Sequence, residues 1–197
     1  MRTLLLSALA MVVCLAVPAF AGPVDCLECH KDLTTKKVVH AAVTMGCDSC
    51  HTDVDASEVP HKFGKGKKGL SSQTPELCFG CHDKKEFTKK SEHAPVAAGS
   101  CGDCHDYHSS NNEKLLKQVG NRLCAQCHPD IEKKPHVIMR PPTGAHTLAG
   151  RRDPNRDGKP FGCISCHVPH SSQWGKLYRY EASQPSDMCK HCHEFLR

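Results

Sequence analysis

Every cysteine after residue 21 belongs to one repeated motif, Cys-x-x-Cys-His, and this feature constrains the chain more than any other. The motif occurs seven times in 197 residues and accounts for all but one of the 15 cysteines. We number the motifs 1 to 7 in chain order: Cys26, Cys29 and His30; Cys47, Cys50 and His51; Cys78, Cys81 and His82; Cys101, Cys104 and His105; Cys124, Cys127 and His128; Cys163, Cys166 and His167; and Cys189, Cys192 and His193.

The spacing within the motif matches the covalent attachment of a porphyrin. Two thiols separated by two residues lie about one helical turn apart, so both meet the vinyl groups of one porphyrin edge, and the adjacent histidine reaches the iron. Structural zinc takes four ligands and would leave one of seven pairs unmatched. A disulfide framework gives no reason for the histidines, and no βαβ pattern supports a thioredoxin-like motif. The sequence predicts seven covalently bound haem c groups, with the motif histidines as proximal iron ligands.

The N-terminal apolar run has the features of a signal peptide. Arg2 precedes an apolar stretch, residues 4–17, that is short for a membrane span, and residues 19–21 form a small-x-small cleavage site. Residues 1–21, including Cys14, are therefore expected to be removed. We expect a periplasmic location, with an extracellular one as the alternative, and no membrane-spanning segment in the exported chain.

Eight histidines lie outside the motif positions, and seven of them are candidates for distal iron ligands. His191 lies between the two cysteines of motif 7, where the backbone is committed to placing His193, so we set it aside. The candidates equal the motifs in number: His40, His61, His93, His108, His136, His146 and His170. Met45, Met139 and Met188 are alternative sixth ligands, but with enough histidines we expect bis-histidine coordination.

The close spacing of two histidine pairs predicts that neighbouring haems share a segment. His108 follows His105 by three residues, and His170 follows His167 in the same way. On a short helical turn such residues lie on one face, so His108 is unable to reach the far side of the haem bound by His105. We expect His108 and His170 each to ligate a different haem, which brings two haems into close approach.

The motifs also group into a larger repeat. His40, His93 and His146 each precede a pair of motifs, and residues 104–110 parallel residues 166–172. We predict a leading single-haem segment (22–39) followed by three doubled units (40–92, 93–135 and 136–197). His136 is an extra leading histidine whose partner stays open.

Composition argues against an ordinary hydrophobic core. Apolar residues make up 39% of the chain and aromatic residues only 5%, which is sparse for a domain of this length. Helical periodicity is weak, with residues 113–119 and the motif turns as the helix candidates, and Pro and Gly punctuate the rest. The predicted fold is mostly irregular, with short α-helices, no substantial β-sheet and a chain of covalent haems as its core.

The formal net charge of +5 does not predict nucleic-acid binding in an exported chain. A basic run at residues 62–68 is expected to offset haem propionates, or to dock an acidic redox partner. Residues 153–158 match the opening of a calcium loop, but Ile164 stands where the loop needs Glu, so we predict a polar turn.

Taken together, the doubled motifs and flanking histidines resemble those of multihaem c-type cytochromes that transfer electrons in the periplasm or outside the cell. The resemblance implies closely spaced, low-potential bis-histidine haems in an electron-transfer protein that is not an enzyme. Its partners would be other cytochromes, or membrane quinol-linked or outer-membrane electron-transfer complexes. A multihaem reductase of nitrite, hydroxylamine or a sulfur oxyanion, with one open haem, is the alternative. Self-assembly also stays open.

Overall fold

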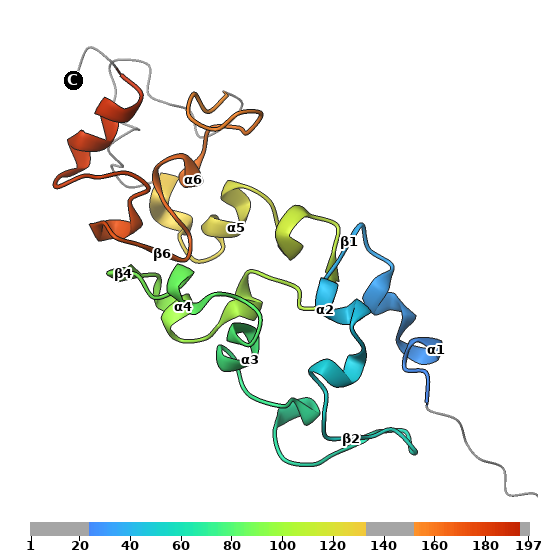
Figure 1. Ribbon diagram of the computed structural model, residues 1–197. Coiled ribbons are helices and arrows are strands. Elements are labelled where there is room, and N and C mark those ends of the chain that lie inside the picture. The colour runs from blue at the N-terminus through green and yellow to red at the C-terminus, as the bar shows by residue number, and fades with distance from the viewer. Residues whose placement is uncertain (1–23, 133–151, 194–197) are drawn as a thin grey trace, which may run out of the picture.

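The computed structural model describes residues 24–132 and 152–193, and there the chain forms only short elements (Figure 1). The α-helices are α1 (Leu27–His30), α2 (Ala41–Thr44), α3 (Glu76–Phe79), α4 (Ala94–Ala97), α5 (Asn121–Ala125) and α6 (Cys163–Cys166). The strands are β1 (Val38–Val39), β2 (Val54–Asp55), β3 (Lys62–Phe63), β4 (Ser91–Glu92), β5 (Ser109–Ser110) and β6 (Ser171–Ser172). The 3₁₀ turns are η1 (Lys31–Thr34), η2 (Cys47–Ser49), η3 (Lys67–Gly69), η4 (Lys84–Glu86), η5 (Cys101–Asp103), η6 (Glu113–Leu115), η7 (Pro129–Glu132), η8 (Gly175–Leu177) and η9 (Pro185–His191). The predicted fold class is confirmed.

Each of the seven motifs closes one helical turn in the same way. The backbone N–H of the motif histidine donates to the carbonyl of the first cysteine, four residues earlier, at 2.9–3.0 Å in all seven motifs. This hydrogen bond is of the α-helical type. The same hydrogen bond therefore closes the turn around the two thiols and the imidazole in every motif, although the first cysteine lies in a 3₁₀ turn in motifs 2, 4 and 7.

The strands pair in three antiparallel ladders of two residues each. β2 pairs with β3 within one hairpin, whereas β1 pairs with β5 and β4 pairs with β6 across long stretches of sequence. The two long-range ladders have equivalent places in the repeat, because each joins the strand before a leading histidine to the strand after the next unit's first motif. They tie each doubled unit to the one that follows it.

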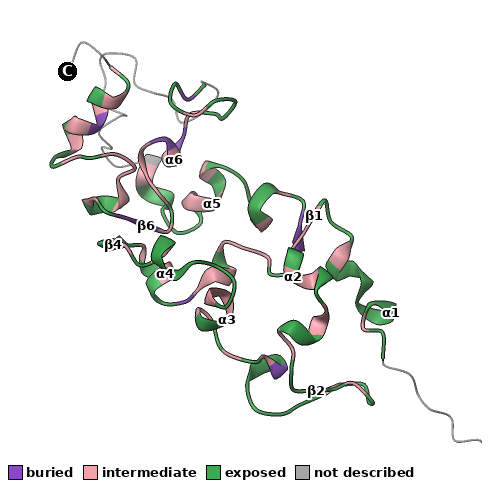
Figure 2. Ribbon diagram, viewed as in Figure 1, coloured by how far each residue is buried: buried purple, intermediate pink, exposed green. Residues whose placement is uncertain are grey.

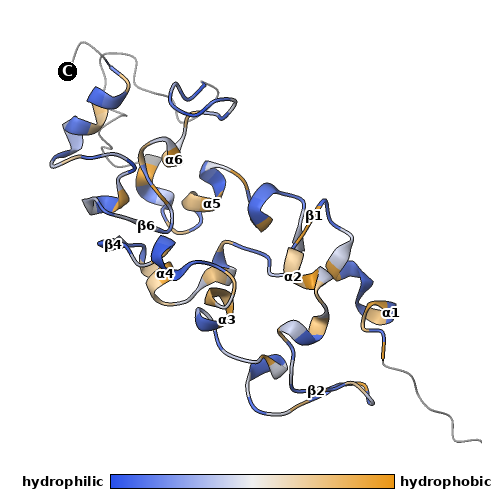
Figure 3. Cartoon of the chain, in the orientation of Figure 1, coloured by the Kyte–Doolittle hydropathy of each residue, from blue (hydrophilic) through white to orange (hydrophobic). Residues whose placement is uncertain are grey.

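Within the described residues there is almost no buried apolar side chain (Figure 2). Met188, at 9% exposure, is the one buried hydrophobic residue in that part of the chain, whereas four serines, Ser109, Ser110, Ser171 and Ser172, are buried at 1–4% exposure. Apolar residues are spread over the short helices along the molecule rather than gathered in one layer (Figure 3). The polypeptide alone therefore supplies no conventional core.

The predicted helix at residues 113–119 is wrong. Only Glu113–Leu115 forms a 3₁₀ turn, Lys114 inside it has non-helical angles (φ 57°, ψ 26°), and Leu116 is extended. The reason is long-range pairing: the backbone N–H of Asp106 donates to Leu115 and that of Lys117 donates to Cys104. These contacts outweigh local helix propensity.

The segment from His105 to His108 is a bend that leads into β5 rather than the helical turn predicted from the sequence. The carboxylate of Asp106 holds this bend, since its Oδ1 accepts from the backbone N–H of His108 at 3.1 Å and from that of Ser109 at 3.4 Å. Local side-chain acceptors of this kind compete with helix formation.

Residues 153–158 form a turn. Oδ1 of Asp153 accepts from the backbone N–H of Asn155 at 2.9 Å, and its Oδ2 pairs with Arg156 at 3.4 Å. Across residues 24–132 and 152–193, no helix has the length and apolar character needed to cross a membrane. The predicted signal peptide (residues 1–21) and the candidate ligands His136 and His146 lie outside the described residues.

Candidate haem sites

Five of the motif histidines each face one of the distal candidates. The ring centroids lie 5.9 Å apart for His30 and His61, 6.2 Å for His82 and His40, 6.2 Å for His51 and His108, 6.3 Å for His128 and His93, and 6.0 Å for His105 and His170. The interplanar angles are 59°, 14°, 9°, 20° and 36° in the same order.

The separations fit two imidazoles that coordinate one metal ion from opposite sides. A metal–imidazole bond of about 2 Å, with roughly 1 Å more from nitrogen to ring centre, places the two centroids about 6 Å apart. The five observed pairs all lie near that value. Two imidazoles at this separation, beside a pair of thiols, fit a covalently attached iron porphyrin.

In each of these five pairs, one imidazole is oriented by a backbone carbonyl that lies 2.8–2.9 Å from its Nδ1 atom. The distal candidates held in this way are His40 by Tyr107, His61 by Glu58 and His93 by Pro169. The motif histidines held in this way are His51 by Lys68, His105 by Lys114 and, in motif 6, His167 by Lys176. Because a carbonyl only accepts hydrogen bonds, Nδ1 carries the proton and Nε2 is left as the metal-binding nitrogen.

The pairing follows the repeat but crosses unit boundaries. The leading histidines His40 and His93 face the second motif of their own unit. By contrast, His108 and His170 face the first motif of the preceding unit, which is why neither faces the motif histidine three residues before it.

His191, which lies between the two cysteines of motif 7, has a different environment from the paired histidines. The ring of His191 stacks on Tyr180 at 4.6 Å, and its Nε2 contacts the carbonyl oxygen of Glu181 at 3.0 Å. That nitrogen is therefore already engaged by a carbonyl oxygen.

The motif histidine of motif 6 stacks on an aromatic ring. The ring centroid of His167 lies 5.6 Å from that of Tyr178, and the two rings are nearly parallel.

The thiols of successive motifs lie near one another in chain order. The thiols of three pairs are close enough that the neighbour contributes to a raised pKa: Cys26 acts on Cys47, Cys101 on Cys78 and Cys163 on Cys124. The remaining neighbours lie within electrostatic range: Cys50 of Cys78, Cys104 of Cys124 and Cys127, and Cys166 of Cys189 and Cys192. The attachment sites thus follow one another in space as in sequence, and Figure 1 shows the described elements running from α1 at one end to η9 at the other.

Burial favours the neutral form of two candidate ligands and of several thiols. Burial, with a smaller effect of the facing His51, lowers the pKa of His108, and burial followed by the charge of His105 lowers the pKa of His170. Burial and the neighbouring Cys101 raise the pKa of Cys78 to about 11. A neutral imidazole is the form that binds a metal.

Two kinds of residue near these sites were not predicted from the sequence. Phe87 lies between two pairs, with its ring 4.9 Å from His170 and 6.4 Å from His82; the equivalent positions of the repeat hold no aromatic residue, so no signal marked it. Lys114 and Lys176 supply carbonyls to motif histidines, and each lies nine residues after that histidine. A Lys-Leu pair that recurs nine residues after a motif histidine could have predicted this contact from the sequence.

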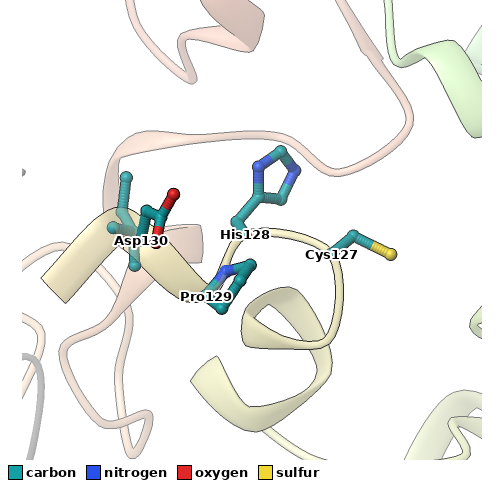
Figure 4. A pocket seen from close by; sticks show the side chains of 5 residues that line it. Cys127, His128, Pro129 and Asp130 are labelled. Atoms are coloured by element: carbon teal, nitrogen blue, oxygen red, sulfur yellow. The ribbon is translucent and has the colours of Figure 1, made fainter. Parts of the chain in front are cut away.

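Motif 5 borders a cavity of about 250 Å³ lined by Cys127, His128, Pro129, Asp130 and Ile131. In Figure 4 the imidazole of His128 stands away from the backbone of the loop, and the thiol of Cys127 projects from the same turn. A free thiol and an imidazole beside an open space are compatible with covalent attachment of a haem.

Repeated thiol pairs, closed motif turns and facing imidazoles define a multihaem c-type cytochrome. The family described as "Doubled CXXCH motif" matches residues 40–87, 93–133 and 153–197, and the chain belongs to this family of haem-binding, electron-transfer proteins. It is also similar to the multiheme cytochrome MtrA of Shewanella baltica (strain OS185), with 33% identity over 116 residues, which is 53% of this chain and 31% of that protein. The chain therefore matches about a third of the length of that relative.

Proposed function

We propose that the chain is a heptahaem cytochrome that passes electrons between redox partners through closely spaced bis-histidine haems. The observation that carries the proposal is the set of five facing imidazole pairs, 5.9–6.3 Å apart between centroids. When bound, each haem supplies an iron that accepts and releases one electron. The family matches, which cover both motifs of each doubled unit, support the proposed division into a leading segment (22–39) and three doubled units (40–92, 93–135 and 136–197).

The polypeptide has two tasks in this function. The paired thiols anchor one edge of each porphyrin, as in other c-type sites. The facing histidines would supply two nitrogen ligands to each iron, which favours electron transfer over substrate binding because no ligand position would be left for a substrate. We propose His136 and His146 as the two remaining distal ligands, which completes seven pairs with His167 and His193.

The spatial order of the thiols supports a single path. Successive motifs are neighbours from motif 1 to motif 7, so electrons would enter at one end of the described structure and leave at the other. The ends are α1, which lies within motif 1, and η9, which contains Cys189 of motif 7. Electrons would therefore move in several short steps between neighbouring haem sites rather than in one long transfer.

The cellular location and the redox partners that we propose rest on the sequence. The predicted signal peptide supports export to the periplasm, and other redox proteins, including quinol-linked or outer-membrane complexes, are the proposed donors and acceptors. The exposed lysines at positions 65, 67 and 68 would favour an acidic partner.

Three measurements on the exported holoprotein test the proposal. Mass spectrometry is expected to show seven covalent porphyrin additions, and the oxidised protein is expected to be entirely low-spin. Carbon monoxide should not bind the reduced protein rapidly. Fewer additions, or zinc in place of iron, would refute the cofactor assignment, whereas rapid stoichiometric carbon monoxide binding at one haem would favour a reductase.

A further inference from the structure

The three doubled units share an unusual backbone conformation after their first motif. Two consecutive residues adopt the left-handed region in each unit: Lys68 and Gly69 (φ 59° and 64°), Lys114 and Leu115 (φ 57° and 58°), and Lys176 and Leu177 (φ 54° and 57°). Each pair occupies the centre of a four-residue turn that a backbone hydrogen bond closes, from Leu70 to Lys67, from Leu116 to Glu113 and from Tyr178 to Gly175.

Five of these six residues are not glycine, although the conformation is unfavourable for residues with a side chain. Gly69 shows that the repeat tolerates glycine there. Strained residues persist only where the surrounding structure holds them, and here the same strain recurs in three separate places. The recurrence indicates that the turn has a role in positioning a neighbouring side chain, in addition to connecting two segments.

The group it positions is the motif histidine. The carbonyl of the first left-handed residue lies 2.9 Å from Nδ1 of His51, 2.8 Å from Nδ1 of His105 and 2.9 Å from Nδ1 of His167. An antiparallel bridge fixes the register, because the residue after each turn pairs with the same histidine: Leu70 with His51, Leu116 with His105 and Tyr178 with His167. The lysine side chains are exposed, so the backbone makes this contact.

We propose that these left-handed turns are positioning elements that orient the proximal imidazoles of motifs 2, 4 and 6 and lower the reduction potentials of the three haems they ligate. The inference rests on the proposed haem function. A hydrogen bond from Nδ1–H to a carbonyl increases the electron donation of the imidazole to a bound metal. Greater donation stabilises the oxidised iron, so loss of the bond raises the potential.

Adjacent leucines in unit 2 offer a matched test on the full holoprotein. Leu115→Val places a β-branched residue where φ is 58°, which is strongly disfavoured, whereas Leu115→Gly permits the same angle. Leu116→Val is the control, because Leu116 is extended (φ −69°, ψ 138°) and accepts valine readily. The readout is a redox titration followed by electron paramagnetic resonance, which follows the oxidised low-spin signals as they disappear.

Leu115→Val is expected to move one component of the titration to a more positive potential, and adding Leu177→Val should move a second. Leu115→Gly and Leu116→Val should titrate like the wild type. Should Leu115→Val not fold, Leu115→Ala, which disfavours the left-handed region less, should give a smaller shift in the same direction. An unchanged titration of a folded Leu115→Val or Leu115→Ala protein, or an equal shift with Leu115→Gly, would overturn the inference. A wild type without low-spin bis-histidine signals would instead refute the proposed function.

Discussion

The backbone N–H of His40 donates a hydrogen bond to the carbonyl of His108 at 2.8 Å, although 68 positions separate them in sequence. Their side chains face different motif histidines, His82 and His51. His93 and His170 repeat the contact at 3.0 Å. Each contact joins two neighbouring candidate haem sites through a single backbone hydrogen bond and the short ladder beside it, so ligands from two units share one rigid connection.

Removal of His108 is expected to open one iron. His108→Ala takes away the imidazole that faces His51, so the reduced holoprotein should bind carbon monoxide at one haem. The control is His191→Ala, because Nε2 of His191 contacts Glu181 rather than a motif histidine. That variant should bind no more carbon monoxide than the wild type. Equal binding by both variants, or by neither, would contradict the assignment of His108.

The buried serines of β5 and β6 give a stability prediction. Ser171 Oγ donates to the carbonyl of Glu86 at 2.8 Å and accepts from the backbone N–H of Lys89 at 3.3 Å, while the equivalent Ser109 Oγ has no partner among the described residues. Ser171→Ala should lower the free energy of unfolding by about 1–2 kcal/mol more than Ser109→Ala. Denaturant titration of the two holoproteins compares them, and equal losses would refute the distinction.

Phe87 should stabilise the junction between two units. Its ring lies near those of Phe79, His82 and His170, and aromatic pairs contribute about 0.5–1.5 kcal/mol beyond area burial. Phe87→Leu is therefore expected to lower the free energy of unfolding by about 1 kcal/mol or more. Phe63→Leu is the matched control, since Phe63 is 50% exposed and should change stability by less than about 0.5 kcal/mol. A larger loss at Phe63 would contradict the assignment.

Cofactor attachment should be necessary for folding. With Met188 as the one buried hydrophobic side chain in residues 24–132 and 152–193, little apolar burial is available to offset the conformational entropy of the chain. A variant with all fourteen motif cysteines changed to alanine is expected to lose its native circular dichroism signal, because cofactor binding supplies the folding free energy. A cooperative thermal transition in that variant would show that the polypeptide folds without haem.

The sequence alone determined where the motif turns lie and, for residues 24–132 and 152–193, that no large sheet forms. Cysteine and histidine spacing sufficed because each motif is one local turn, closed by a hydrogen bond between residues four apart, such as His30 and Cys26. Low apolar content also indicated an irregular fold. These properties depend on neighbours in sequence and on composition, so no long-range information was needed.

Only the tertiary structure decided which histidine faces which, because those contacts join residues far apart in sequence. His108 meets His51 and His170 meets His105 through ladders whose strands are two residues long, too short to leave a periodic pattern. The same pairing replaced the predicted helix at 113–119 with a left-handed turn that brings Lys114 to His105. The physical reason is that backbone pairing with another segment, such as that of Lys117 with Cys104, outweighs the local helix propensity that sequence periodicity reports.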